Sequence, residues 1–209
     1  MGMGPVRHGG SRGPSKWTVL VALFATLIVA DQVTKFLAVE GLTTVFQAHG
    51  DATLAEKVRG FYTHRHLLPH ATAPHTVWEP MWAMRYVENA GAAWGLFQEM
   101  SEGARNAFFT VVSLAAVAFI LFYYRRLRRE QRYAQLALSM LLAGAMGNFV
   151  DRLARRYVID FIDWYAGSYH WPTFNVADSL IVVGVALLLL QPGPKRAAEG
   201  GAEGAARGG

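Results

Sequence analysis

The chain has 209 residues, a formal charge of +5 and no cysteine, which excludes disulfides, thiolate nucleophiles and cysteine-based metal sites. Hydrophobic residues make up 53% and charged residues 17%, with a mean hydropathy of +0.20. A soluble domain carries about 25% charged residues, so this balance favours a membrane protein.

The first apolar segment, Trp17–Val39, predicts a membrane span. Its uninterrupted part ends at Ala30 and would rise only about 21 Å, short of the roughly 30 Å hydrocarbon core. We therefore expect the helix to continue through Asp31 and Lys35, whose i,i+4 spacing with the acid first favours an ion pair. The alternative is a cleaved signal peptide ending near Ala30, but position −3 is then Ile28 rather than a small residue.

A long loop follows, from about Glu40 to Arg105. Its segment Thr72–Phe97, "TAPHTVWEPMWAMRYVENAGAAWGLF", mixes aromatic and β-branched residues with Pro and Gly, and predicts a small β element at the membrane surface. A His-rich tract precedes and enters it. The tract lacks a recognised ligand spacing, so metal binding is the weaker interpretation for His64, His66, His70 and His75.

Three further apolar segments predict spans at Asn106–Tyr124, Tyr133–Val150 and Phe174–Leu190. The short link Arg125–Arg132 holds five arginines and should be cytoplasmic. Basic residues near both chain ends place the two termini on the same side. We therefore predict an all-α membrane protein with four transmembrane helices and a small extracytoplasmic β element.

The predicted organisation is a disordered cytoplasmic N-terminus at 1–16, a four-span domain at 17–191 and a disordered cytoplasmic tail at 192–209. An outer-loop insertion is expected at about 41–85. In this topology the polar residues that interrupt the apolar segments converge on one leaflet, which is the first sign of a site.

Two of these polar clusters have simple structural interpretations. Asn175 and Asp178 are spaced i,i+3 at a helix start, where Asn caps the helix and Asp benefits from the helix dipole. Asn148 and Asp151 are also spaced i,i+3, and a local pair of Asp151 with Arg152 would fix the helix end. The capping interpretation does not explain why Asp178 is placed within apolar sequence, whereas for Asn148 and Asp151 we predict the structural role, as a scaffold for other residues.

Asp160 is flanked by Ile159 and Phe161 in a short run that fits either strand or helix, so we expect it to be partly desolvated. Asp163 is expected to be a solvated loop acid. Two carboxylates brought close cannot both ionise easily, so one can activate water while the other protonates a leaving amine. Peptide hydrolysis near the outer surface is therefore a physically sensible use of Asp160 and Asp178, and we expect no cofactor and no metal.

Five blocks, in this order, resemble the bacterial lipoprotein signal peptidase family (signal peptidase II): "DQVTK" (31–35), "NAGAAWG" (89–95), "GNFVDR" (147–152), "VIDF" (158–161) and "FNVADSLI" (174–181). The resemblance implies a four-helix aspartyl peptidase of the bacterial inner membrane. It implies a substrate, a prolipoprotein with diacylglycerol on its lipobox cysteine, and a cut immediately before that cysteine.

Matched block by block, the resemblance implies that Asp160 and Asp178 form the catalytic dyad. It implies that Asn89, Arg152 and Asn175 position substrate or dyad, and that four residues are structural support: Asp31, Lys35, Asn148 and Asp151. The sequence departs from the family pattern at Trp94, where Phe is common, and in the wide stretch from residue 31 to residue 89, where the His-rich segment is the apparent insertion.

The expected partners are the lipidated prolipoprotein and membrane lipids, with no nucleic acid, and the chain is expected to be monomeric. A proton- or ion-coupled transporter and a non-enzymatic membrane scaffold are the rival classes. All the embedded acids lie at one leaflet, which argues against a relay that crosses the membrane. A scaffold would use the same Asn and Asp residues to hold helices together.

Overall fold

The computed structural model describes residues 14–65, 67–91, 96–97 and 99–190. His66, Trp94 and the predicted tail at 192–209 lie outside the described residues, as do residues 1–13 of the predicted N-terminal segment. The elements in chain order are α1 (Lys16–Leu42), α2 (Val45–His49), α3 (Leu54–Thr63), the 3-10 helix η1 (Leu68–His70), β1 (His75–Trp78), β2 (Trp82–Asn89), α4 (Glu102–Arg126), α5 (Arg132–Arg155), β3 (Val158–Ala166), β4 (Tyr169–His170) and α6 (Val176–Leu189).

Three of the described helices, α1, α4 and α5, are long and apolar enough to cross a membrane. They coincide with the first three predicted spans, and α1 continues unbroken through Asp31 and Lys35 as its length required. The fourth predicted segment forms α6, which has only 14 residues and rises about 21 Å. The protein is therefore a mostly helical membrane protein.

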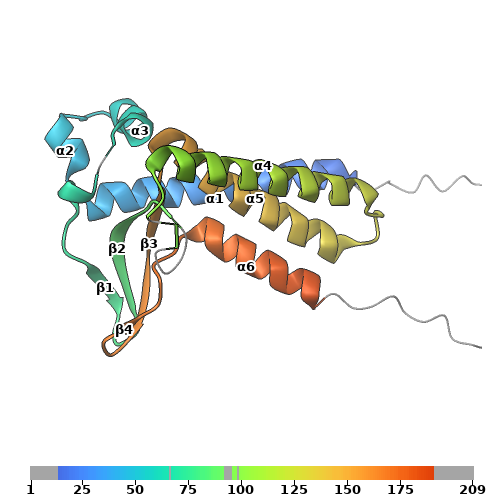
Figure 1. Cartoon of the computed structure of the whole chain (residues 1–209). Coiled ribbons are helices and arrows are strands. Elements are labelled where there is room, and N and C mark those ends of the chain that lie inside the picture. Colours follow the sequence, from blue (N-terminus) through green and yellow to red (C-terminus); the bar gives the residue numbers. More distant parts are fainter. Residues whose placement is uncertain (1–13, 66, 92–95, 98, 191–209) are drawn as a thin grey trace, which may run out of the picture.

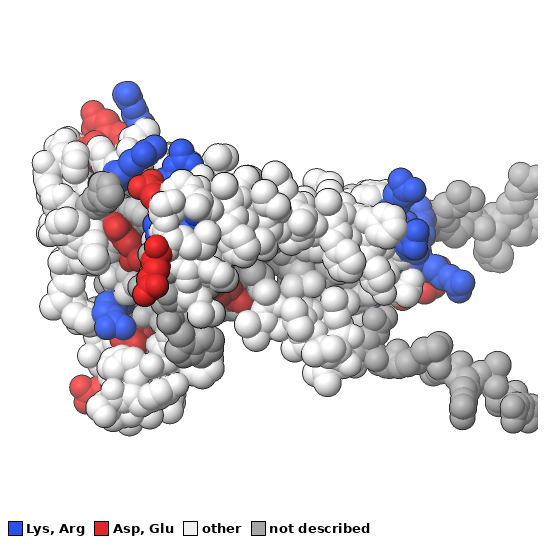
Figure 2. Space-filling view, in the orientation of Figure 1, with Lys and Arg blue, Asp and Glu red and all other residues white. Residues whose placement is uncertain are grey.

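α5 is the central helix of the bundle and contacts α1, α4 and α6 (Figure 1). In the most apolar 18 residues of each helix, 56% of the residues of α5 are buried, against 17% for α1 and 11% for α4. α1 and α4 therefore present most of their surface outward. α6 approaches α5 closely because Gly144 has no side chain; a Cβ there would overlap the carbonyl oxygen of Ala177. The charged side chains visible in Figure 2 gather toward the two ends of the bundle and leave a long uncharged stretch between them, as a membrane-embedded domain requires.

A four-stranded antiparallel sheet, in the order β1-β2-β3-β4, lies at one end of the bundle (Figure 1). The predicted β element is confirmed as β1 and β2, and the ambiguous run around Asp160 is a strand, β3. Phe174 pairs with Ile162 of β3 through two backbone hydrogen bonds of 2.8 and 3.1 Å. This pairing brings the first turn of α6 against β3.

The segment 41–85 contains α2, α3, η1, β1 and the first half of β2, and its three helices were not predicted. α3 is opened by a capping box in which the side chains of Thr53 and Glu56 each bond the other's backbone N–H. The segment shares one buried apolar cluster with the end of α1 and the sheet, so it belongs to the same folded unit. Beyond the end of α1, its buried contributions to that cluster are Val45, Phe46, Phe61 and Leu67.

Candidate active site

The two aspartates expected to act together come from different elements. Asp160 lies within β3, opposite Val87 of β2, and is only 1% exposed. Asp178 is the third residue of α6 and is partly buried. A first-turn position suits a carboxylate because the unpaired N–H groups of a helix start carry partial positive charge.

Asn175 connects the two carboxylates. Its side-chain amide donates to Asp160 Oδ1 at 2.7 Å, and its backbone N–H donates to Asp178 Oδ2 at 3.2 Å. Its side-chain oxygen accepts from the Asp178 backbone N–H at 3.0 Å, which completes a capping box at the start of α6. The capping interpretation and the site interpretation of Asn175 therefore hold together: the residue that begins the helix also joins the pair.

Two more asparagines complete the shell. Asn148 donates to Asp178 Oδ1 at 2.7 Å, and its own oxygen accepts from Lys35 Nζ and from the Asn175 amide, each at 3.2 Å. Asn89 donates to Asp160 Oδ2 at 2.9 Å while accepting from the Gly91 N–H at 3.1 Å. Each aspartate thus receives hydrogen bonds on both of its oxygens.

Burial, which is the larger cause, and the nearby charge of Asp178 together raise the pKa of Asp160 to about 7. The amides of Asn89 and Asn175 oppose the rise because they donate to the ionised form. A carboxyl group with a pKa near 7 can hold a proton or release one at neutral pH. This is the behaviour that an acid–base catalyst needs.

Beneath the pair lies a fully buried ion network. Lys35 Nζ is 3.0 Å from Asp31 Oδ2 and 2.9 Å from Asp151 Oδ2, and all three side chains are 0% exposed. Arg155 Nη1 is 2.9 Å from the second oxygen of Asp151 and is equally buried. Moving any member of such a network away from its partners would leave a buried charge uncompensated, which is strongly destabilising, so the members hold one another in place.

The network connects the elements that carry the aspartates. Asp31 Oδ1 accepts the backbone N–H of Ala177 at 2.9 Å, and Asp151 Oδ2 accepts that of Ile159 at 3.3 Å. The first contact anchors the start of α6, one residue before Asp178, and the second anchors β3, one residue before Asp160. The expected ion pair of Asp31 and Lys35 is therefore part of a brace that fixes both aspartate-bearing segments.

Arg152 does not pair with Asp151, contrary to the sequence interpretation. Neighbouring helix residues point about 100° apart, so the residue one turn later, Arg155, takes that place. Arg152 instead donates to the Gly91 carbonyl at 3.1 Å and stacks on Phe109, 4.2 Å from its ring centre. Its charge interacts with both Asp178 and Asp160. Sequence reasoning missed Arg155, although its i,i+4 spacing from Asp151 was visible.

Asp163 is not the solvated loop acid that was expected. It is only 2% exposed, accepts from His170 Nδ1 at 2.9 Å and lies 3.5 Å from Arg85 Nε. Residues three apart on a strand point to opposite faces, so Asp163 is directed away from the pair around Asp160. The return of β4 onto β3 supplies His170, a contact that local sequence does not encode.

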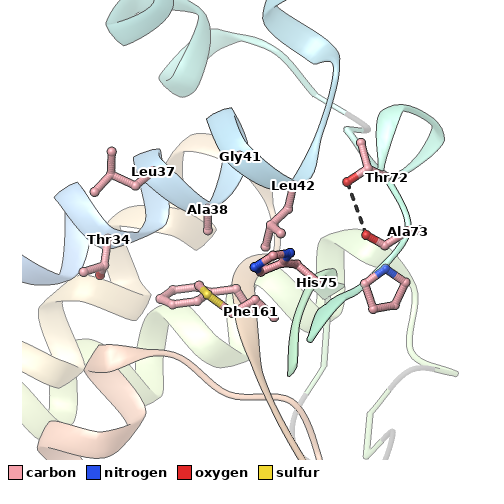
Figure 3. A pocket seen from close by; sticks show the side chains of 11 residues that line it. Thr34, Leu37, Ala38, Gly41, Leu42, Thr72, Ala73, His75 and Phe161 are labelled. Carbon is pink, nitrogen blue, oxygen red and sulfur yellow. Dashed lines mark hydrogen bonds between the residues drawn. The ribbon is translucent and has the colours of Figure 1, made fainter. Parts of the chain in front are cut away.

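Among the described residues, His64 of the His-rich tract contacts protein side chains. His64 Nε2 lies 2.6 Å from Asp51 Oδ2, and its ring stacks on His49. No group of three or more His, Asp or Glu residues suited to a metal ion occurs in the described part of the chain. A cavity of about 560 Å³ at the end of α1, lined by Leu37, His75 and Phe161 (Figure 3), contains neither Asp160 nor Asp178.

A helical membrane protein that joins two carboxylates through a shared asparagine has the architecture expected of a membrane-embedded aspartic peptidase. The sequence profile of the signal peptidase (SPase) II family matches residues 23–192, and the chain belongs to this family of proteases. The lipoprotein signal peptidase of Anaeromyxobacter sp. (strain Fw109-5) is 62% identical over 188 residues, which are 88% of this chain and 89% of the relative. That of Desulforapulum autotrophicum is 34% identical over 172 residues, 82% of this chain and 90% of the relative.

Two solved structures of a bacterial membrane enzyme have the same fold. They superpose with TM-scores of 0.59 and 0.58 at 24% sequence identity. The match covers 82% of this chain and 85% and 90% of the two solved chains. The family profile and the curated relatives confirm the family resemblance found in the sequence blocks, and the solved structures show that the fold is one already known in a membrane enzyme.

Proposed function

We propose that this chain is an aspartic endopeptidase that removes signal peptides from diacylglyceryl-modified prolipoproteins by cutting just before the lipidated cysteine. Family membership supports the reaction class. The single observation that carries the mechanism is Asn175, which hydrogen-bonds Asp160 through its side chain and Asp178 through its backbone. One residue thereby holds two acids from different elements in a fixed relation.

In the proposed reaction the pair holds one proton between its two carboxyl groups. The ionised carboxylate takes a proton from a water molecule as that water attacks the scissile carbonyl carbon, and the protonated carboxyl donates to the carbonyl oxygen. Collapse of the tetrahedral intermediate transfers a proton to the leaving amine and restores the pair. The raised pKa of Asp160 supports assigning it the proton at neutral pH.

The remaining polar residues take supporting roles in this proposal. Asn89 and Asn175 orient Asp160, and Arg152 directs its positive charge toward the pair, where it can bind a backbone carbonyl of the substrate. Structural support comes from Asn148, which orients Asp178, and from the ion network beneath it: Asp31, Lys35 and Asp151.

We propose further that α6 is a fourth span and that the site lies at the periplasmic face of the bacterial inner membrane. Lys16 at the start of α1 donates to the carbonyls of Arg125 and Leu127, at 2.7 and 2.8 Å, so the start of α1 lies beside the arginine-rich link. The excess of arginine in a short link favours the cytoplasmic side. The sheet lies at the opposite end of the bundle (Figure 1), and this end includes β3, which carries Asp160, and the start of α6, which carries Asp178.

The proposal is tested by incubating purified protein with a diacylglyceryl-modified precursor and with its unlipidated form. Asp160→Asn and Asp178→Asn should each reduce turnover at least about a thousandfold, because an amide can neither accept nor donate the catalytic proton. Asp163→Asn is the matched control: it alters a buried acid on the same strand whose side chain points away from the pair.

Near-normal turnover by either dyad variant would refute the assignment of the pair, provided that the control is active. Equal cleavage of the lipidated and unlipidated precursors would refute the proposed substrate class while leaving the catalytic pair in place. The two parts of the proposal are therefore tested separately.

A further inference from the structure

One side of α3 is apolar and uncovered. Leu54, Val58 and Tyr62 are spaced four residues apart and so lie on one side of the helix. Their exposed fractions are 70%, 43% and 40%. A second side of the helix is polar and charged and includes Lys57, which pairs with Glu40 at 2.8 Å, while Phe61 is buried in the core. An apolar edge beside a polar side is the pattern of a helix that lies at the surface of a bilayer.

The apolar edge of α3 continues into the outward surface of α1. On α1, Val29 and Val33 are also four residues apart and are 59% and 49% exposed. A groove of about 540 Å³ separates these valines from Leu54 and Val58, and Val150 of α5 also lines it. We name this the α1–α3 groove. Because α1 is long and apolar enough to cross a membrane, its outward side chains face lipid, and the groove is continuous with that surface.

The few polar groups beside the groove are occupied by the protein. The Tyr62 hydroxyl donates to the Gln32 side-chain oxygen at 3.2 Å, and the Gln32 amide nitrogen is 3.1 Å from Asp31 Oδ2. Neither residue therefore needs a polar ligand in the groove. The surfaces that remain open to a ligand are hydrocarbon, and the matching chemistry is an acyl chain.

The depth of the groove fits the same ligand. Val29 and Val33 follow Lys16, the first residue of α1, by 13 and 17 positions, which correspond to about 20 and 26 Å of helix rise. The hydrocarbon core of a bilayer is about 30 Å thick, so a span that enters near Lys16 places these valines within its far half. The edge of α3 therefore meets the acyl chains of one leaflet rather than water.

We propose that α3 is a membrane-interface helix and that the α1–α3 groove binds an acyl chain of a bilayer lipid. The inserted segment 41–85 then contacts the leaflet through Leu54 and Val58 while its remaining surface stays in the aqueous phase. Arg155 holds the end of α3 in place: its guanidinium donates to the Phe61 carbonyl through Nε at 2.8 Å and also through Nη2. The lipid contact is thereby tied to the same arginine that pairs with Asp151.

The test uses the absence of cysteine from the chain, which allows a single fluorescent label to be placed at will. Val58→Cys places a bimane label on the apolar edge. Arg59→Cys is the matched control, since the next helix residue points about 100° away. Each labelled full-length protein is inserted into phospholipid nanodiscs that hold one copy, with or without brominated acyl chains, and its cleavage activity is measured to verify folding.

Brominated chains should quench the label at position 58 about threefold more strongly than the label at position 59, because only the apolar edge reaches the acyl region. Equal and weak quenching at both positions would place α3 in water and overturn the proposal. Quenching at position 58 that is relieved by saturating lipidated precursor would assign the groove to the chains of the substrate instead. Protection of position 58 only in discs that hold several copies would assign it to a second copy of the chain.

Discussion

Removing one hydrogen bond to Asp160 should move the pH range in which the enzyme works. The proposed pair acts only while it retains one proton, and the pKa of Asp160, raised to about 7 by burial and by Asp178, sets the upper limit. Activity should therefore fall as pH rises through about 7. The bond from Asn89 to Asp160 Oδ2, at 2.9 Å, favours the ionised form and so lowers this limit.

In Asn89→Ala that bond is lost, ionisation becomes harder, and the pKa of Asp160 should rise. A hydrogen bond to a charged group is worth about 1.5–3 kcal/mol, and each pKa unit corresponds to about 1.4 kcal/mol. Asn89 is only partly buried, so water replaces part of the interaction. The upper limb of the pH–activity profile should then move by about one unit, from near 7 to near 8.

The assay is kcat/KM for the lipidated precursor over the range from about pH 5 to pH 9, since this quantity reports the ionisation of the free enzyme. Glu88→Gln is the control on the adjacent position of β2. Glu88 accepts from the Leu68 N–H at 2.9 Å, and as the neighbour of Asn89 on β2 it points to the opposite face of the sheet, so its profile should keep the upper limb near 7. An Asn89→Ala limb that stays in place or moves to lower pH would refute the role of this bond.

Three further predictions concern stability, each measured as the apparent melting temperature or unfolding free energy in lipid micelles. Lys35→Met leaves the buried carboxylates of Asp31 and Asp151 without their shared cation and should cost about 3–5 kcal/mol. Lys57→Met, which breaks the partly exposed pair with Glu40, should cost less than about 1 kcal/mol, and similar losses from both variants would contradict the burial argument. The pKa of Asp160 rises from 3.8 to about 7 on folding, so its contribution to stability is complete below pH 3.8 and is lost as pH rises to about 7. This loss amounts to up to about 4 kcal/mol, so the wild type should lose more stability over this interval than Asp160→Asn. Parallel stability curves for the two proteins would speak against the raised pKa. Gly147→Ala should destabilise by about 1–3 kcal/mol because its Cβ would overlap the Asp31 carboxylate. Gly103→Ala is the control and should have little effect, because nothing lies within 4 Å of the added Cβ. Equal effects of the two substitutions would mean that the α1–α5 contact is loose.

The parts of the fold that the sequence predicted are those fixed by local pattern. Long apolar runs predicted α1, α4 and α5, because a span needs only length and hydropathy. The ion pair of Asp31 and Lys35 followed from i,i+4 spacing, and the cap at Asn175 from its position before an apolar run. The family blocks then grouped residues that no periodicity could bring together.

What was missed depends on contacts between distant segments or on a periodicity that was not applied. The helices of the inserted segment went unpredicted although Thr53 and Glu56 have capping-box spacing and Leu54 and Val58 have helical spacing. The burial of Asp163 arises from the β3–β4 hairpin, which only the fold reveals. The sequence interpretation paired Asp151 with the adjacent Arg152, but helix geometry places Arg155, four residues later, beside Asp151.

The charge balance of the ion network is consistent with its position close to the pair, because a neutral network would not remove the proton that the pair is proposed to share. Asp31 and Asp151 carry two negative charges, and Lys35 and Arg155 carry two positive ones, so the network sums to zero and its field falls off quickly. A network with an excess cation would favour ionisation of both aspartates and lower the pKa of Asp160. Lys35 alone does lower it, but that effect ranks below burial and below the charge of Asp178. The fold thus gains rigid positioning of β3 and α6 from charged groups while burial continues to control the protonation of Asp160.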